Sequence, residues 1–269
     1  NTVLYTGDGA TTQAITGVGF EPDFLWTKKR SATGFHALVD SVRGATNYLS
    51  SNSTNIEYDD AEYIASLDSD GFTVGVNTVT NDNTETFVAW NWKAGGAAVS
   101  NTDGSITSSV SANPTAGFSI AAYTGTGSTG TIGHGLSVKP ELIFCKSLDG
   151  VTNWGGQFEP LGPTKYMHLD TDGAVGTAST PWNDAAPTAS LWTVGTAGAT
   201  NNSGEDYIAY LFHSVEGYSK VGSYEGNANA DGTFVYTGFR PAYVLCRRYS
   251  AISGWHIFDD KRDGDYNVI

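Results

Sequence analysis

The sequence repeats itself, and this repetition constrains the fold more than any other feature. The string YTGDG at Tyr5 recurs as YTGTG at Tyr123, 118 positions later, and more loosely as YEGNA at Tyr224. In the same way GFEPDFLWTKK, from Gly19, matches SVKPELIFCKS 118 positions later and GFRPAYVLCRR 219 positions later. Self-similarity at fixed offsets indicates separate units that pack on one another.

The matches also predict where the units begin and end. TFVAWNWKA, from Thr86, matches DYIAYLFHS, from Asp206, so the first two copies are nearly complete, whereas the third has only the opening strands. We therefore predict a β-sandwich repeat over 1–98, a Gly/Ser/Thr-rich connector over 99–116, a second repeat over 117–217 and a partial third repeat over 218–269. Such a fragment cannot easily bury a face alone. We expect it to pack on its neighbours, or the natural protein to continue past Ile269.

Composition and alternation together predict an all-β chain with almost no helix. There are 33 Gly and a single Met, and aromatic residues are abundant, which favours short strands joined by tight turns. Val88, Trp90 and Trp92 fall on one face of the strand TFVAWNWKA, and we predict this to be the core face. The expected architecture is a tandem of antiparallel β-sandwich modules of jelly-roll or concanavalin-like type.

Charge and hydropathy exclude several classes of partner. Asp and Glu number 28 against 14 Lys and Arg, for a formal net charge of -14, which argues against nucleic-acid binding. No apolar run approaches the length of a membrane span, so no membrane insertion is expected, and the N-terminus lacks the basic start and apolar stretch of a signal peptide. Cys145 and Cys246 are predicted to be separate thiols.

Catalytic and cofactor motifs are missing from the sequence. It contains no G-x-S-x-G nucleophile elbow, no phosphate-binding loop and no H-E-x-x-H pair, so we expect no enzyme activity, no cofactor and no metal. The strings Asp68–Gly71 and Asp170–Gly173 resemble the start of a calcium loop but lack its later ligands, which favours ordinary hairpin turns. A polysaccharide depolymerase, which needs two carboxylates, stays an alternative. The available carboxylates are Glu159, Asp170, Glu205, Asp206, Asp259 and Asp260.

Two further recurrences indicate structural roles. His36 aligns with His256 in the third copy, and recurrence within a repeat favours a structural histidine over a ligand. Asp40 and Arg43 recur as Asp259 or Asp260 with Arg262, which predicts an ion pair at a module corner. In the second copy Gly162 replaces the arginine, so we expect that corner to be remodelled.

The tryptophans provide the best candidates for a ligand site. Trp26, Trp90 and Trp92 lie in strand patterns and are predicted to be core. Trp182, in the loop TPWNDAAP, is predicted to be an exposed platform for a sugar ring, with Asn183 and Asp184 binding its hydroxyls. Trp154 and Trp255 begin the segment after the apolar strand, and there each ring either covers the core or faces a ligand. Ligand-binding candidates are therefore Trp182, Asn183, Asp184, Trp154 and Trp255.

The repeated strings resemble an uncharacterised family found in tail, fibre-like and other structural proteins of marine tailed phages. The resemblance rests on YTGTG, on the spacer NTDGSITSSVSANPTAGFSI, on EGYSKVGSYEGN and on GFRPAYVLCRR followed by DDKRD. It implies a virion-associated β module displayed on the outer, extracellular face, with other virion proteins as partners and no catalytic residues to transfer.

Three functions are therefore expected from the sequence and the resemblance. The first is a tail-fibre or surface-appendage segment for host attachment, with a host surface glycan as ligand and a homo-oligomer as the assembly. The second is a capsid-decorating or spacer module with no host ligand. The third is the depolymerase.

Overall fold

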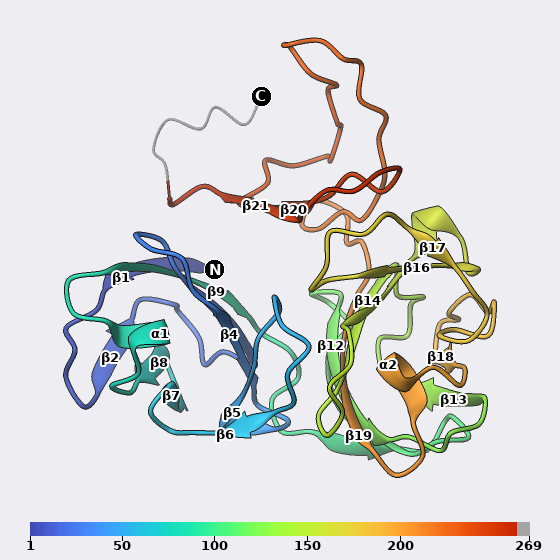
Figure 1. Cartoon of the computed structure of the whole chain (residues 1–269), viewed down its shortest axis with the longest axis horizontal. Helices are drawn as coiled ribbons and strands as arrows, with labels where there is room; N and C mark the ends of the chain where they lie inside the picture. Colours follow the sequence, from blue (N-terminus) through green and yellow to red (C-terminus); the bar gives the residue numbers. More distant parts are fainter. Residues whose placement is uncertain (263–269) are drawn as a thin grey trace.

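The computed structural model describes residues 1–262, in which three groups of antiparallel strands surround a common centre (Figure 1). The first module, at the left of Figure 1, is a sandwich of a six-stranded and a three-stranded sheet. In order across the large sheet, the strands are β1 (Thr2–Thr6), β9 (Thr86–Trp92), β3 (Phe24–Lys29), β4 (His36–Asp40), β5 (Gly44–Leu49) and β6 (Tyr58–Asp59). The small sheet consists of β2 (Gln13–Thr16), β8 (Gly71–Val74) and β7 (Ile64–Asp68).

The second module, at the right of Figure 1, repeats this plan with an eight-stranded and a two-stranded sheet. The large sheet runs β10 (Val99–Asn101), β11 (Ser108–Asn113), β12 (Phe118–Thr124), β19 (Asp206–Phe212), β14 (Leu142–Ser147), β15 (Gly155–Phe158), β16 (Lys165–His168) and β17 (Gly176–Thr177). The small sheet pairs β13 (Gly130–Gly133) with β18 (Leu191–Val194). Six strands of its large sheet, from β12 to β17, follow the order of the first module.

The third segment is smaller and lies above both modules in Figure 1. Its strands β20 (Tyr243–Cys246) and β21 (His256–Asp259) form a two-stranded sheet that corresponds to β3 and β4. The helices of the described chain are short: α1 (Thr78–Asn81) and α2 (Gly198–Asn201) have four residues each, and η1 (Glu159–Leu161) is a 3-10 turn. The all-β, sandwich-type fold predicted from the sequence is thus confirmed.

Buried asparagines explain why the YTG turns recur. Asn81, on α1, accepts a hydrogen bond from the Asp8 backbone at 2.9 Å and donates to the Ala10 carbonyl at 3.1 Å. Asn201, on α2, makes the same pair of bonds to Thr126 and Ser128 at 2.7 Å each. A side chain at Gly7 or Gly125 would place its Cβ within 2.3 Å of a backbone carbonyl oxygen, so only glycine fits there. The turn is therefore a structural clamp between the start of a module and its helix.

The central strands of both large sheets, β3 and β9 in one and β14 and β19 in the other, are buried on both faces. Phe87 and Ala89 of β9 face the small sheet of their own module, whereas Val88 and Trp90 face the centre of the molecule. The sequence predicts a core face at Val88 and Trp90, and both side chains are buried in a core. That core is the one shared with the other modules, whereas the Phe87 face closes the sandwich of the first module. Alternation along one strand could not distinguish two buried faces.

The central core draws on all three groups of strands. Its buried members include Trp26 and Trp90 from the first module and Phe144 and Tyr210 from the second, and Leu245 of the third segment packs against them. Phe24 stacks on Tyr210 across the module boundary, with ring centroids 4.2 Å apart. The expectation that Trp26 and Trp90 are core residues is confirmed, and Trp92 is half-buried against the same cluster.

Two sequence predictions are wrong in detail. Residues 99–116, predicted to be a connector, contain β10 and β11, which extend the second module's large sheet through β12. The second error concerns the alignment of the third copy with the first. The pairing of β20 with β21 shows that, along β21, this alignment is shifted by one residue from the one predicted from the sequence. Phe24 faces Asp40 and Tyr243 faces Asp259, so Trp255 occupies the position of His36, and His256 does not. A slip of one residue moves every side chain to the other face of a strand.

Other sequence predictions agree with the structure. Cys145 and Cys246 are separate free thiols. Asp68 and Gly71 close the hairpin between β7 and β8. No helix within residues 1–262 is long and apolar enough to cross a membrane.

Candidate functional site

The structure places Trp182 inside the second module. Its side chain is 0% exposed and belongs to the sandwich core together with Trp192 and Tyr207. The prediction of an exposed platform is therefore wrong, since a fully buried ring offers no face to a sugar. The loop carries few strand-forming residues, so its sequence gave no sign that it folds back over its own sheet.

Trp154 and Trp255 both cover the central core. Trp154 is 0% exposed, stacks on Tyr210 and donates its indole N–H to the Ser50 carbonyl of the first module at 2.9 Å. Trp255 is half-buried, stacks on Phe158 of the second module and donates to the His168 carbonyl at 3.1 Å. Of the two roles left open for these rings, the structure shows the covering one.

Asn183 and Asp184 are the exposed members of the predicted site. Both lie on the loop after Trp182, and both have a left-handed backbone, with φ of 51° and 53°. Asn and Asp tolerate this conformation better than other residues with a Cβ. Their role in binding stays a prediction.

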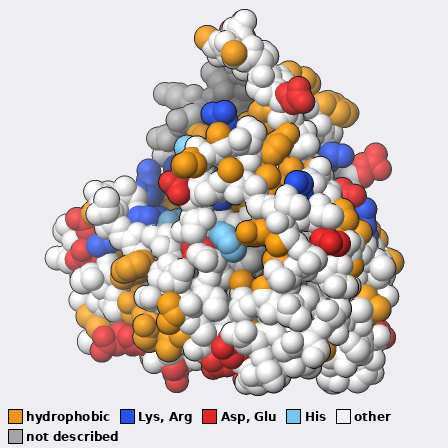
Figure 2. Space-filling model, turned by 45° about the vertical axis from the view of Figure 1, so that its right-hand side comes forward, with side chains coloured by type: hydrophobic (Ala, Val, Ile, Leu, Met, Phe, Trp, Pro, Cys, Tyr) orange, Lys and Arg blue, Asp and Glu red, His pale blue; other side chains and the backbone are white. Residues whose placement is uncertain are grey.

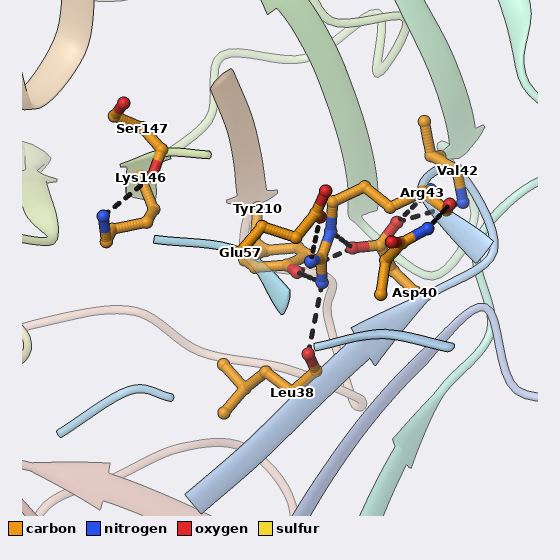
Figure 3. A network of polar contacts seen from close by, with 9 residues as sticks. Leu38, Asp40, Val42, Arg43, Glu57, Lys146, Ser147 and Tyr210 are labelled. Atoms are coloured by element: carbon orange, nitrogen blue, oxygen red, sulfur yellow. Dashed lines mark hydrogen bonds and ion pairs between the residues drawn. The ribbon is translucent and has the colours of Figure 1, made fainter. Parts of the chain in front are cut away.

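A buried polar corner joins the first module to the second (Figure 3). Arg43 donates to the Asp40 carboxylate at 2.6 Å and to the Glu57 carboxylate at 2.8 Å. The Tyr210 hydroxyl, on β19, donates to Asp40 at 2.8 Å and accepts from Arg43 at 3.1 Å. Burial disfavours the Arg43 charge, but Asp40, Tyr210 and Glu57 outweigh it, so the pKa of Arg43 is raised. The predicted corner ion pair is confirmed, and it also holds two modules together.

The third segment makes the same corner against the first module. Arg262 donates to Asp259 at 2.5 Å, and the Asp259 carboxylate accepts the indole N–H of Trp90, on β9, at 3.1 Å. The Arg262 guanidinium also lies over the Trp90 ring, 5.3 Å from its centroid. Trp90 and Tyr210 are repeat-equivalent, 120 positions apart. This register shows that Asp259, of the two candidates, is the partner of Arg262.

The contacts between modules therefore follow one cyclic rule. The corner of the first module holds Tyr210 of the second, and the corner of the third segment holds Trp90 of the first. Indole bonds run in the opposite direction, because Trp154 bonds back to the first module and Trp255 bonds back to the second. Three similar units arranged around one axis produce this pattern.

The second module's own corner is remodelled, as predicted. The 3-10 turn η1 stands where an arginine-bearing turn would be, and Gly162 ends it with φ of 87°. Glu159 forms an exposed ion pair with Lys139 at 2.7 Å. This module thus holds no buried Asp–Arg pair at that place.

Two lysines at the ends of the repeated apolar strands, Lys28 and Lys146, donate hydrogen bonds to backbone carbonyls of the loops that follow them. Lys146 is buried and donates to the Ser147 carbonyl at 2.7 Å and the Gly150 carbonyl at 3.0 Å. Lys28 makes the equivalent bonds to the Lys29 and Ala32 carbonyls at 2.6 and 3.4 Å. Burial lowers the pKa of Lys146 to about 8. Both ammonium groups have structural acceptors.

Most of the carboxylates considered for a depolymerase have structural partners. Asp170 accepts from the Asn153 side chain and the Trp154 backbone, at 2.9 and 3.0 Å. Glu205 accepts from Ser147 at 2.7 Å, and Asp206 accepts from Thr124 at 2.7 Å. Within residues 1–262, no group of three or more His, Cys, Asp or Glu could hold a metal ion.

Sequence reasoning missed several of the residues that join the units. Glu57 lies between β5 and β6, in a loop with no recognised repeat, and the roles of Tyr210 and Asn81 were not predicted. The repeat did contain a signal for the asparagine, because TVTN from Thr78 and GATN from Gly198 align at the 120-residue offset.

The fold and these contacts define an all-β protein of tandem sandwich modules joined around one aromatic core. The chain belongs to the family described as Domain of unknown function (DUF7483), whose model matches residues 1–269. The comparisons with curated proteins and with solved structures found no match.

Proposed function

We propose that this chain is a structural segment of a virion appendage, in which the modules form one rigid body that spaces or decorates the particle. The proposal rests mainly on one observation: the tryptophans and Asp–Arg pairs that stand out in the sequence make contacts between units of the chain itself. Trp154, Trp255 and both Asp–Arg corners bond one unit to the next. Because these side chains bind other parts of the same chain, they are not free to bind a receptor, which favours a structural role.

Two further features favour the proposal. The resemblance to structural proteins of tailed phages covers nearly the whole chain and implies a virion location. The central strands of the large sheets are also held from both sides, by the small sheet of their module and by the central core, and such close packing resists bending.

An antibody raised against the purified chain tests the virion location. We expect it to label the outer surface of the virus particles in immunogold electron microscopy. Particles that carry no label, with the protein found only in the unassembled fraction, would refute the proposal. The molecular mass in solution, measured by light scattering, tests the separate prediction of a homo-oligomer.

Host attachment through a glycan is a second candidate, and one observation favours it. Asn183 and Asp184 present an amide and a carboxylate to solvent from consecutive left-handed positions of one loop. Amide and carboxylate side chains are suited to hydrogen-bond sugar hydroxyls.

A glycan array with Asn183→Ala and Asp184→Ala tests this candidate. Binding by the parent chain that both variants lose would support it. Asp172→Ala, at another exposed aspartate of the same module, is the matched control and should leave binding unchanged. Failure of the folded parent to bind any glycan or host envelope would remove the candidate.

A further inference from the structure

Two tyrosine rings lie face to face at one edge of the first module. The centroids of the Tyr48 and Tyr63 rings are 3.7 Å apart, and the ring planes are inclined by only 15°. Tyr48 is on β5 of the large sheet and Tyr63 directly precedes β7 of the small sheet, so the pair connects the two sheets of the sandwich. The side chains also share a hydrogen bond, which places their hydroxyl groups next to each other. Both residues are partly exposed, so a reagent in solution can reach the pair.

The other stacked pairs of tyrosines within residues 1–262 are wider apart or buried. Tyr58, on β6, stacks on the Tyr48 ring with a centroid distance of 5.6 Å and an angle of 24°. Tyr123 and Tyr207 stack at 5.2 Å, but both are buried inside the second module. Figure 2 shows hydrophobic side chains, a class that there includes tyrosine, at the surface in the lower part of the molecule, at the height of β6 in Figure 1. Close stacking and exposure are therefore combined in the pair of Tyr48 and Tyr63.

The second module keeps one member of this pair and lacks the other. Tyr166, on β16, is the repeat-equivalent of Tyr48, because β5 and β16 hold the same place in their sheets. The carbonyls of Tyr63 and Pro181 accept equivalent hydrogen bonds from threonine hydroxyls of α1 and α2, so a proline takes the place of Tyr63. The ring beside Tyr166 is that of His168. Tyr166 therefore serves as a control within the same chain.

We propose that Tyr48 and Tyr63 are a site of oxidative modification, at which a covalent bond joins the two rings. The oxidant is hydrogen peroxide used by an enzyme of the haem-peroxidase class, which removes electrons from phenols singly. Each tyrosine loses one electron together with its phenolic proton and becomes a radical, and the peroxide is reduced to two molecules of water. The inference does not depend on a virion location.

Face-to-face stacking is the geometry from which two such radicals couple. The unpaired electron of a tyrosyl radical is shared with the ring carbons beside the C–O carbon, in orbitals perpendicular to the ring, so stacked rings direct these orbitals at each other. The centroid separation of 3.7 Å is close to the separation of about 3–3.5 Å from which aligned atoms react. A carbon–carbon bond forms between one such carbon of each ring. Each of these carbons then loses its hydrogen as a proton and each oxygen regains one, so the product lacks two hydrogen atoms.

A bond between these rings links the two sheets of the first module covalently. It closes the loop of chain from Tyr48 to Tyr63, which removes conformational freedom from the unfolded chain and so stabilises the folded module. Disulfides have this effect in other proteins, but the first module contains no cysteine. The cross-linked chain is therefore expected to unfold at a higher urea concentration than the untreated chain.

Oxidation of the whole chain at low concentration, with a haem peroxidase and one equivalent of hydrogen peroxide, tests the site. A protease that cleaves beside acidic residues separates the two tyrosines, because Glu57 and Asp60 lie between them. We expect mass spectrometry to find the peptides of Tyr48 and Tyr63 joined and lighter by two hydrogen atoms, with Tyr166 unmodified. The product should migrate as a single chain in denaturing electrophoresis. A chain unfolded in urea before oxidation should lose the preference for this pair.

Two variants locate the bond. Tyr63→Phe keeps an aromatic ring in the stack but removes the phenol, and it should lower the yield of cross-linked product about tenfold or more. Tyr166→Phe, at the repeat-equivalent of Tyr48, is the matched control and should leave the yield unchanged. If either variant fails to fold, the peptide map of the unaltered chain still decides. A bond to Tyr58 in place of Tyr63, bonds between separate chains only, the same preference in the unfolded chain, or no cross-link would each overturn the proposal.

Discussion

Replacing Arg43 with methionine is expected to destabilise the protein strongly, because it leaves a buried carboxylate without its charge partner. The Asp40 side chain is 0% exposed and that of Arg43 is 3% exposed. The variant loses the bonds from Arg43 to Asp40, Glu57 and Tyr210. Breaking a buried ion pair by removing one partner costs about 3–5 kcal/mol. Asp40 keeps hydrogen bonds from two backbone N–H groups and from the Tyr210 hydroxyl, so we expect the lower end, about 3 kcal/mol.

Arg262→Met is the matched control, since it removes the repeat-equivalent arginine. The Arg262 side chain is 25% exposed, so water reaches the site and screens the pair. We expect a loss of about 1 kcal/mol for this variant, within the range of partly exposed pairs. Adding Asp40→Asn to Arg43→Met should recover about 1 kcal/mol or more, because the neutral amide does not need a charge partner.

Urea denaturation followed by tryptophan fluorescence and circular dichroism measures these differences. The two signals should change together, since Tyr210 and Arg43 belong to different modules and couple their unfolding. A loss below about 1 kcal/mol for Arg43→Met, or a loss equal to that of Arg262→Met, would refute the argument that a buried, shared carboxylate makes this corner costly to break.

Three further outcomes are expected. Asn201→Ala should cost about 3 kcal/mol in urea denaturation, because buried backbone groups at the YTG turn lose their partner, and an unchanged midpoint would contradict the clamp. Trp154→Phe keeps an aromatic ring but removes the hydrogen bond to the Ser50 carbonyl, and it should lower the free energy of unfolding in urea by about 2 kcal/mol. A clearly smaller loss would mean that the ring, and not the hydrogen bond, is what joins the two modules. Burial lowers the pKa of His36 to about 3, and its Nδ1 accepts from the Trp26 indole, so the unfolded chain binds a proton that the folded chain does not between about pH 6.5 and 3. The parent should therefore lose up to about 1.4 kcal/mol per pH unit over that window relative to His36→Gln, and parallel curves would refute it.

The repeat made most of the architecture predictable. The apolar strands that end at Lys28 and Lys146 hold the same place in their sheets, and the Asp40–Arg43 pair forms as expected. Matching strings identify equivalent strands because each string encodes both a turn and the strand beside it. This is local information, which a sequence carries directly.

The candidate site was not predictable in the same way, because it depends on what lies across a module boundary. Trp182 sits in a loop with no alternation, and only its contacts in the sandwich core show that it is buried. The inner face of β9 likewise looks like an ordinary core face until the second module is placed against it. A pattern along one strand reports that a face is buried but does not report which surface buries it.

The contact between Trp90 and Asp259 also affects the order of events during synthesis. These residues are 169 positions apart, so the acceptor of the Trp90 indole N–H emerges about 10–30 s after the tryptophan at ordinary elongation rates. During that interval the inner face of the first module is partly open to water, and a neighbouring chain has access to it. The first module is thus synthesised before the units that cover its inner face, and that face is completed only when the third segment has followed.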